Sequence, residues 1–410
     1  MEWKKLIIGL IIKLSKKIIY KMNSFERKFA YIYMRASIFL SYIVCFFLSI
    51  VFRLYSFFFK KPKKDLGIFL HSSINSDGYN RRFAMFFKFF EDDNISYSLF
   101  SHVDENETHI LSNNNYRKQH YLLYKKIAWI RALQIPKAVF YKNIILQRSL
   151  FPLYPSYEKP IFEKILRKQN ANIILDIWDP IHLWKPKLTF SSFKYVDKIS
   201  VNVFELKEVY SQYKNKEDIY IWPISVNPEL YEKKEVYETN SIVKLFYTGS
   251  PGNIKEYLLP ILPVLEKTHH KTPLELHVLS SIKLKSETIT IYNYKWDSKT
   301  LKNLIANCDY GIYPNFNNQK FFTVAGKVLD YMTTGLPIIG ANYGLPKKIN
   351  IEKSIFTLNS LEDWNNRFEE IVSSKAKLRK QKAEYARKFV LKELSIENGF
   401  NSILEFLKPK

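Results

Sequence analysis

The stretch NNQKFFTVAGKVLDYMTTGLPIIGANYG, residues 317–344, carries the most informative pattern in the chain. Its middle predicts a helix that Gly335 and Pro337 end, just before an apolar run typical of a buried strand. The start of this helix has little side-chain bulk, so its backbone amides and its positive dipole end favour a diphosphate group. Lys327 and Asp330 are three residues apart and share one helix face. A plain core helix with a surface ion pair fits the same spacing.

Strands and helices alternate outward from this stretch in both directions. Apolar runs predict the strands LGIFLHSS, SYSLF, AVFYKNIILQ, NIILDIW, KISVNV and IYIWPI in the first half, and VKLFYTG, LELHVLS, TITIYNY, DYGIYP and LPIIGA in the second. Helices are expected between them, at FAMFFKFFEDDN and over residues 157–168, 204–213, 257–267, 298–307 and 325–334. This alternation predicts parallel sheets whose ligands bind at the carboxyl ends of the strands.

The length of 410 residues exceeds what one hydrophobic core usually organises, and the 47% hydrophobic content is enough for two. We therefore expect an α/β protein with two Rossmann-like domains that face a cleft. The predicted domains cover residues 65–235 and 236–410, with a polar linker near residues 227–241 and helices that close the second domain. Residues 1–64 form a separate helical segment.

This N-terminal segment contains fourteen Lys or Arg and two Glu, so it holds +12 of the formal net charge of +24. Apolar residues recur on one helical face, at Ile7, Ile11, Leu14, Ile18, Met22, Phe25, Phe29 and Ile32. Residues 36–52 carry no charge, and both flanks of this run are basic. Because both flanks favour the cytoplasm, we expect a monotopic or re-entrant helix on the cytoplasmic face of the cell membrane rather than a single span.

The partner of this basic segment is therefore predicted to be an anionic membrane surface. A core-packing helix with a solvated basic face is the alternative, and the apolar stripe argues against a nucleic-acid partner. Cys45 and Cys308 are expected to be ordinary buried thiols. The sequence has no Asp-x-Asp, no Cys/His cluster, no P-loop and no Rossmann glycine motif, so we expect neither a metal nor a bound cofactor.

The helix within residues 317–344 resembles that of the family 4 group of GT-B glycosyltransferases. The family pattern K-x-x-E-Y-M-A-x-G-x-P is matched by Lys327, Asp330, Tyr331, Met332, Gly335 and Pro337. The resemblance implies that Asp330, in a wet cleft, holds the ribose hydroxyls of a nucleotide-sugar donor. Many members carry a second Glu eight residues earlier, near the transferred sugar, and this chain has Phe322 there.

The segment YTGSPGN resembles the glycine-bearing loop after the first strand of the family's donor domain, and DYGIYP resembles its strand that ends at the donor. The resemblance assigns the leaving diphosphate to Lys255 and Lys327, with Lys320 as a further candidate. The donor-binding residues that it implies are Gly249, Ser250, Asn253, Pro314, Lys320, Thr323, Ala325 and Asp330.

Three first-half segments resemble those of bacterial surface-polysaccharide transferases: Asp77-Gly78 with Arg81-Arg82, Gln147-Arg148, and Asp176 to Asp179. Either Asp179 or His182 is expected to orient or deprotonate the acceptor hydroxyl. The resemblance implies retaining transfer of a sugar to a lipid-linked or glycan acceptor, without a required metal. Because of Phe322, an inactive GT-B protein that binds glycan or scaffolds an assembly complex is the alternative.

Overall fold

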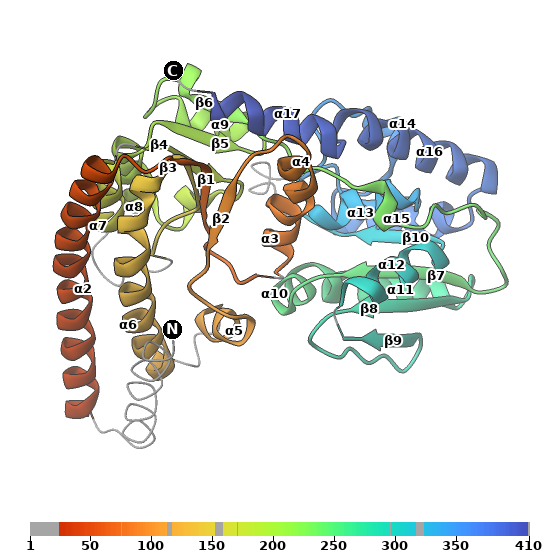
Figure 1. The fold of residues 1–410 in the computed structure, drawn as a ribbon. Helices are drawn as coiled ribbons and strands as arrows, with labels where there is room; N and C mark the ends of the chain where they lie inside the picture. Colours follow the sequence, from red (N-terminus) through yellow and green to blue (C-terminus); the bar gives the residue numbers. More distant parts are fainter. Residues whose placement is uncertain are drawn as a thin grey trace. The chain divides into compact units, whose positions relative to one another are not determined.

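The computed structural model describes residues 24–74, 76–112, 117–151, 159–169, 171–295, 297–316 and 324–408. The chain forms two compact units, each built on its own sheet (Figure 1). Unit 1 contains residues 1–201, 210–220 and 404–410, and unit 2 contains residues 202–209 and 221–403. The polar stretch near residues 227–241 belongs to unit 2, and the last residues of the chain return to unit 1.

The sheet of unit 1 has six strands in the order β2-β1-β3-β4-β5-β6, and the pairings from β2 to β5 are parallel, as predicted. The strands are β1 (Lys64–Phe69), β2 (Tyr97–Phe100), β3 (Tyr141–Gln147), β4 (Asn172–Ile177), β5 (Lys198–Val201) and β6 (Ile219–Ile221). The chain starts at β1, adds β2 on one side and then β3 on the other. The strand order therefore reverses between β1 and β3.

Helices and short 3₁₀ turns connect these strands. The helices are α3 (Asp77–Arg82), α4 (Phe87–Asp92), α5 (Glu105–Ser112), α6 (Arg117–Gln134), α7 (Ile161–Leu166), α8 (Pro186–Ser192) and α9 (Phe204–Tyr210). The 3₁₀ turns are η1 (Ala84–Phe86), η3 (Ile135–Phe140), η4 (Arg167–Gln169), η5 (Ile181–Leu183), η6 (Phe193–Tyr195) and η7 (Lys216–Asp218). A further turn, η8 (Pro228–Leu230), follows β6 and belongs to unit 2.

Arg131 of α6 is a fully buried charge that ties the strand ends of unit 1 together. Its guanidinium donates to the carbonyls of Leu70 at 2.5 Å, Phe100 at 3.0 Å and Leu150 at 2.8 Å, which follow or end β1, β2 and β3. Buried carbonyls without partners are costly, so one side chain here satisfies three loops at once.

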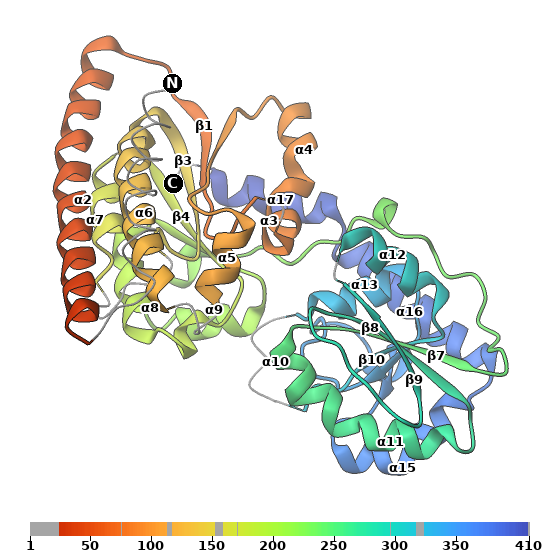
Figure 2. The same ribbon diagram turned by 90° about the horizontal axis from the view of Figure 1, so that it is seen from below.

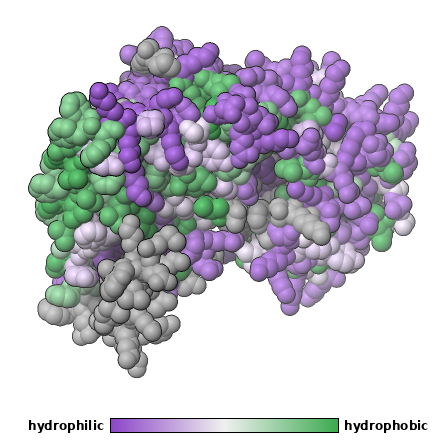
Figure 3. Space-filling view, in the orientation of Figure 1, coloured by the Kyte–Doolittle hydropathy of each residue, from purple (hydrophilic) through white to green (hydrophobic). Residues whose placement is uncertain are grey.

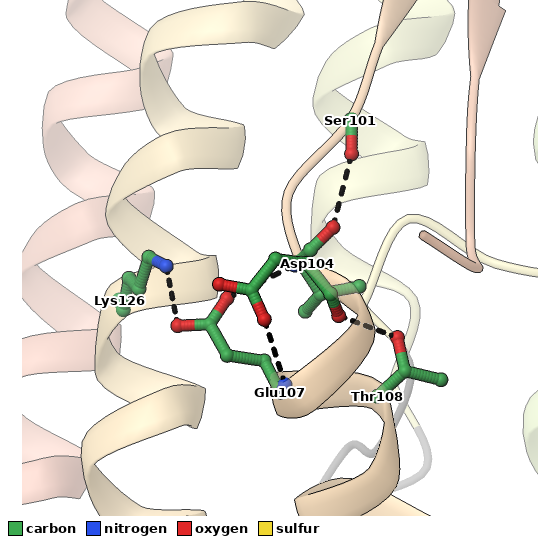
Figure 4. A network of polar contacts seen from close by, with 6 residues as sticks. Ser101, Asp104, Glu107, Thr108 and Lys126 are labelled. Atoms are coloured by element: carbon green, nitrogen blue, oxygen red, sulfur yellow. Dashed lines mark hydrogen bonds and ion pairs between the residues drawn. The ribbon is translucent and has the colours of Figure 1, made fainter. Parts of the chain in front are cut away.

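The N-terminus of α5 is closed by a reciprocal capping box and tied to α6 (Figure 4). The Asp104 carboxylate accepts from the backbone N–H of Glu107 at 2.8 Å, and the Glu107 carboxylate accepts from that of Asp104 at 3.2 Å. Lys126 of α6 then donates to Glu107 at 2.5 Å. This contact fixes the helix that follows the carboxyl end of β2.

The sheet of unit 2 has the order β12-β11-β10-β7-β8-β9, and all its pairings are parallel. Its strands are β7 (Val243–Thr248), β8 (Leu274–Leu279), β9 (Thr290–Tyr294), β10 (Tyr310–Tyr313), β11 (Ile338–Gly340) and β12 (Phe356–Thr357). The strand order reverses between β7 and β10. The short strand β12 was not predicted, because two residues give no sequence period.

Helices cover both faces of this second sheet. They are α10 (Pro251–Asn253), the π-helical turn η9 (Ile254–Leu258), α11 (Leu259–His269), α12 (Ser298–Asn307), α13 (Gly326–Thr334), α14 (Ile351–Ser354), α15 (Leu361–Val372) and α16 (Ala376–Glu393). The last helix, α17 (Ile396–Leu407), begins in unit 2 and ends in unit 1. Figure 2 shows α11 and α15 on one face and α12, α13 and α16 on the other. The predicted helical ending of the chain is confirmed.

Helix α13 ends as the sequence predicted. Gly335 has a φ of +82°, and its N–H reaches the carbonyls of Tyr331 at 3.0 Å and Met332 at 3.1 Å. Glycine adopts this left-handed conformation without strain. The turn sends the chain straight into β11, so the helix start lies at the carboxyl edge of the sheet.

Helix α2 (Ser24–Phe59) precedes β1 and packs along α6, η3 and α7. Met34, Ile38 and Cys45 are buried on its inner face, where Trp129 Nε1 of α6 donates to Ser37 Oγ at 3.0 Å. Its outer face is apolar and exposed, which Figure 3 shows as a hydrophobic surface. The helix is continuous through Arg53, where the sequence separates two apolar segments. Most of the apolar stripe predicted between Ile7 and Ile32 lies outside the described residues.

Two aliphatic residues of α2 provide a matched test of this docking. Ile38 is 2% exposed and Leu40 is 49% exposed. Ile38→Ala should lower the free energy of unfolding of unit 1 by about 2–5 kcal/mol, because it leaves a cavity against α6 and η3. Leu40→Ala should change it by about 0.5 kcal/mol or less. Urea denaturation in mild detergent measures both, and equal losses would show that this face does not dock.

Candidate functional site

In unit 2 the candidate site lies where the strand order reverses, at the carboxyl ends of β7 and β10. Doubly wound sheets bind ligands at this point, because the loops after the two strands diverge there. The loop after β7 contains Gly249 and Ser250, and the strand end of β10 contains Tyr313 and Pro314. The start of α13 reaches the same point through Lys327.

Lys327 connects the three elements. Its Nζ donates to the carbonyl of Thr248 at 2.9 Å and lies 4.3 Å from the ring centre of Tyr247 and 5.5 Å from that of Tyr313. Burial raises the pKa of Tyr313 to about 12, so this ring stays neutral beside the cation. A half-buried ammonium is therefore held between the two strand ends, where an anionic ligand gains most from it.

The loop after β7 is held from two sides. Ser280 Oγ donates to the carbonyl of Gly249 at 2.8 Å, and Ser250 Oγ accepts from the backbone N–H of Asn253 at 3.3 Å, which caps the following helix. A Cβ at residue 249 would lie 2.8 Å from the Tyr247 hydroxyl, so glycine is needed there. Lys255 lies in the next turn, exposed to solvent.

Asp330 differs from the expectation of a carboxylate in a wet cleft. It is 2% exposed, and its Oδ1 accepts a hydrogen bond from the Tyr231 hydroxyl at 2.6 Å. Tyr231 belongs to the segment that packs along α13, where Lys234 and Tyr237 also bind backbone carbonyls of the helix end and its neighbours. A ribose that binds Asp330 has to compete with Tyr231 or use the other carboxylate oxygen.

The remaining residues of the predicted donor site fall in two groups. Pro314 is buried directly after β10, and Ala325 precedes α13 and donates its N–H to the carbonyl of Gly344 at 2.9 Å. Lys320, Thr323 and Phe322 lie outside the described residues. Sequence reasoning did not identify Tyr231, which is 99 positions before Asp330 and carries no motif.

In unit 1 the three weakly matching segments of the sequence converge at the carboxyl ends of β1, β3 and β4. Arg82 of α3 is fully buried and pairs with Asp176 of β4 at 2.6 Å. Ser200 Oγ donates to the same carboxylate at 2.7 Å, and the N–H of Arg148 donates to the Asp176 carbonyl at 2.9 Å. The pairing positions α3 against the strand ends.

Arg148 directly follows β3 in a strained conformation, with a φ of +63° that non-glycine residues rarely adopt. Its guanidinium forms an ion pair with Asp179 and lies 5.9 Å from the ring centre of Trp178. Burial lowers the pKa of Arg148 to about 10. The Asp179 carboxylate is 24% exposed, so it remains open to a ligand at this edge.

His71 is a further residue at this edge of the sheet, and the sequence analysis did not identify it. It follows β1, and its backbone N–H donates to Gln147 Oε1 at 2.9 Å, so the loops after β1 and β3 are joined at the point of strand reversal. Burial, then repulsion from Arg148 and Arg131, lowers the pKa of His71 to about 3. The imidazole is therefore neutral at physiological pH. The sequence signal that could have indicated it is the position of this histidine, directly after the first strand.

His182, the other predicted acceptor-side residue, is 8% exposed in an aromatic cluster. Its Nδ1 lies 3.0 Å from the Tyr210 hydroxyl, and their ring centres are 5.3 Å apart. Burial lowers its pKa. These contacts suit a structural histidine better than a proton acceptor. Within the described residues no group of three or more His, Cys, Asp or Glu side chains has a metal-binding arrangement.

Comparison with known proteins identifies the fold. No protein-family model matches the sequence, and no curated protein matches it. Among solved structures, a glycosyltransferase from Rickettsia africae is similar over 85% of this chain and 98% of its own, with a TM-score of 0.61 and 14% identity. The chain has the fold of GT-B glycosyltransferases.

Two further structures support this fold assignment. Anabaena Alr3699/HepE, solved in complex with UDP and glucose, is similar over 84% of this chain and 99% of its own, with a TM-score of 0.57 and 11% identity. An alpha-glucosyltransferase in complex with UDP-glucose and DNA has a TM-score of 0.55 and 11% identity over the same shares. The predicted GT-B fold, with two parallel sheets and an N-terminal apolar helix, is confirmed.

The buried pair of unit 1 gives a stability test. Asp176→Asn removes the negative charge that faces the buried Arg82 guanidinium, and should lower the free energy of unfolding by about 3–5 kcal/mol. Glu369→Gln, in the exposed pair with Lys271, should cost about 1 kcal/mol or less. Chemical denaturation of the two variants provides the comparison, and an Asp176 effect no larger than the control would contradict this role.

Proposed function

We propose that this chain is a glycosyltransferase that transfers a sugar from a nucleotide-sugar donor, bound by unit 2, to a lipid-linked or glycan acceptor, bound by unit 1. The observation that carries the proposal is the Lys327 ammonium at the strand reversal of unit 2, next to the loop of Gly249 and Ser250. A cation beside a glycine-bearing loop at this point suits a diphosphate. The similarity to glycosyltransferases with bound UDP supports the same assignment.

The chemical task is to stabilise the charge that develops on the departing diphosphate. The bond from the anomeric carbon to the diphosphate oxygen breaks, the acceptor oxygen bonds to that carbon with retention, and the acceptor proton passes to the released nucleoside diphosphate. Lys327 provides a fixed positive charge for this group, with the exposed Lys255 as a further donor. Fixed charges in a partly dry site stabilise such a transition state without reorganisation.

The acceptor is proposed to bind at the carboxyl edge of unit 1. Asp179 accepts a hydrogen bond from the acceptor hydroxyl and so orients it, while Arg148, whose guanidinium lies over the Trp178 ring, holds the carboxylate. Two guanidinium groups at this edge face a carboxylate, in the pairs Arg82 with Asp176 and Arg148 with Asp179, and a third, Arg131, binds backbone carbonyls. Because these three guanidinium groups already have partners, the proposed ligand at this edge is a neutral hydroxyl rather than a second phosphate group. No metal or cofactor is proposed for the reaction.

The proposed location is the cytoplasmic face of the cell membrane, in a role in surface-polysaccharide synthesis. Within the described residues, α2 is long and apolar enough to cross a membrane. The basic residues on both sides of it favour the cytoplasm.

Replacing the cation tests donor binding. Lys327→Gln should weaken the binding of UDP or GDP about ten- to a hundredfold, because a hydrogen bond to a charged group contributes roughly 1.5–3 kcal/mol. Isothermal titration with both nucleotides measures this change. Lys353→Gln, at an exposed lysine of the same unit, should leave affinity unaltered. Binding by neither nucleotide, and no hydrolysis of UDP- or GDP-sugars, would favour the inactive glycan-binding alternative.

Asp330 and Tyr231 form a second test of the donor site. Asp330→Asn should weaken nucleotide binding at least tenfold if the carboxylate holds the ribose. Tyr231→Phe should strengthen it about fivefold, because the ribose no longer competes with a hydrogen bond of roughly 1 kcal/mol. The same titrations and the melting temperatures of both variants are compared. Lower melting temperatures with unaltered affinity in both would assign the pair a structural role alone.

A further inference from the structure

The outer face of α2 is an apolar surface that the proposed donor and acceptor sites do not use. Eight large side chains on it are exposed: Phe29, Tyr33, Leu40, Ile43, Phe47, Val51, Leu54 and Phe58. Their spacing follows the helical period, so they form one continuous row opposite Ile38. Phe47 is 60% exposed and Phe58 is 71% exposed, values typical of a surface that binds a membrane or another protein.

The inner face of the same helix is part of unit 1. Besides the buried residues opposite this row, Tyr42 packs edge-on against Phe162 of α7 with ring centres 4.7 Å apart, and Arg53 donates to the carbonyl of Lys168 at 3.3 Å. The helix has 36 residues, or about 54 Å, whereas the hydrocarbon core of a bilayer is about 30 Å thick. A helix docked along a folded domain cannot cross the bilayer alone.

Lysines line both sides of the apolar row. On one side Lys125 of α6 lies 4.9 Å from the Tyr33 ring centre, and Lys61 lies 5.1 Å from that of Tyr55. On the other side Lys168 lies 5.4 Å from the ring centre of Phe46. The sequences of α6 and η3 contain no acidic residue. An apolar strip with lysines beside it complements an anionic lipid surface, where headgroups flank exposed acyl chains.

We propose that α2 lies flat in the headgroup region of an anionic bilayer, with its outer row in the lipid and its inner face fixed to unit 1. The proposal rests on the proposed membrane location and narrows it. The helix then attaches the protein to the membrane as a rigid part of unit 1, rather than as a flexible tail or a transmembrane span. Unit 1, with the edge at Asp179, is held at a constant distance from the membrane in which a lipid-linked acceptor resides.

Vesicle flotation tests the surface. Wild-type protein added to preformed vesicles of phosphatidylcholine and phosphatidylglycerol should float with them, and Phe47→Asp combined with Phe58→Asp should reduce binding at least tenfold. The control replaces Leu361 and Leu378 of unit 2, both 42% exposed, by Asp and should bind like wild type. Replacing Lys61, Lys125 and Lys168 by Gln should each weaken binding about fivefold on these vesicles and little on pure phosphatidylcholine.

Single cysteines at residues 29, 47 and 58, each labelled with an environment-sensitive fluorophore, distinguish a flat helix from a span. The native Cys45 and Cys308 are buried, which raises the pKa of each to about 12 and keeps them unreactive. A flat helix predicts the same shallow depth at all three positions. If one fluorophore lay deep in the bilayer and the other two lay in water, the helix would span the membrane and the proposal would be overturned. Unaltered flotation of the Phe47 and Phe58 variant would overturn it as well. Nucleotide titration of that variant reports on donor binding separately.

Discussion

Parallel strands impose the constraint on which both units depend. Each strand has to be followed by a crossover on a face of the sheet, so all carboxyl ends meet at one edge. A chain that begins in the middle and builds outward in both directions leaves a reversal, between β1 and β3 in unit 1 and between β7 and β10 in unit 2. The loops diverge at these two points, which is why His71, Arg148 and Lys327 collect there.

The strand ends also leave carbonyls that need donors, and the two units solve this differently. In unit 1, Arg131 is enclosed and gives its donors to the ends of three loops. In unit 2, Lys327 satisfies the Thr248 carbonyl while it remains half-buried. A fully enclosed guanidinium stabilises the loops but cannot meet a ligand, whereas a half-buried ammonium can do both. The difference in burial therefore separates a structural cation from a candidate binding cation.

The sequence predicted most strands because buried parallel strands are continuous apolar runs, as in NIILDIW. It did not predict α6, whose inner row of Ile127 and Ala128 is interrupted by Arg131, a charge that only the folded strand ends explain. Helix α13 was predicted from helix-end signals, whereas the loop after β7 was indicated by its resemblance to a family motif. The contact between Tyr231 and Asp330 was not, because a pairing across 99 residues leaves no periodic trace.

Helix α2 shows why a sequence alone leaves the membrane question open. Both of its faces are apolar, so periodicity cannot tell which one packs on protein and which one remains outside. Small and polar residues decide it: Ser41, Cys45 and Ser49 lie on the inner side, where they allow close approach of neighbouring helices, and the Phe-rich row lies outside. Because the same helix closes unit 1 and carries the exposed row, loss of its inner contacts would weaken the domain and its attachment together, whereas loss of outer residues would weaken attachment alone.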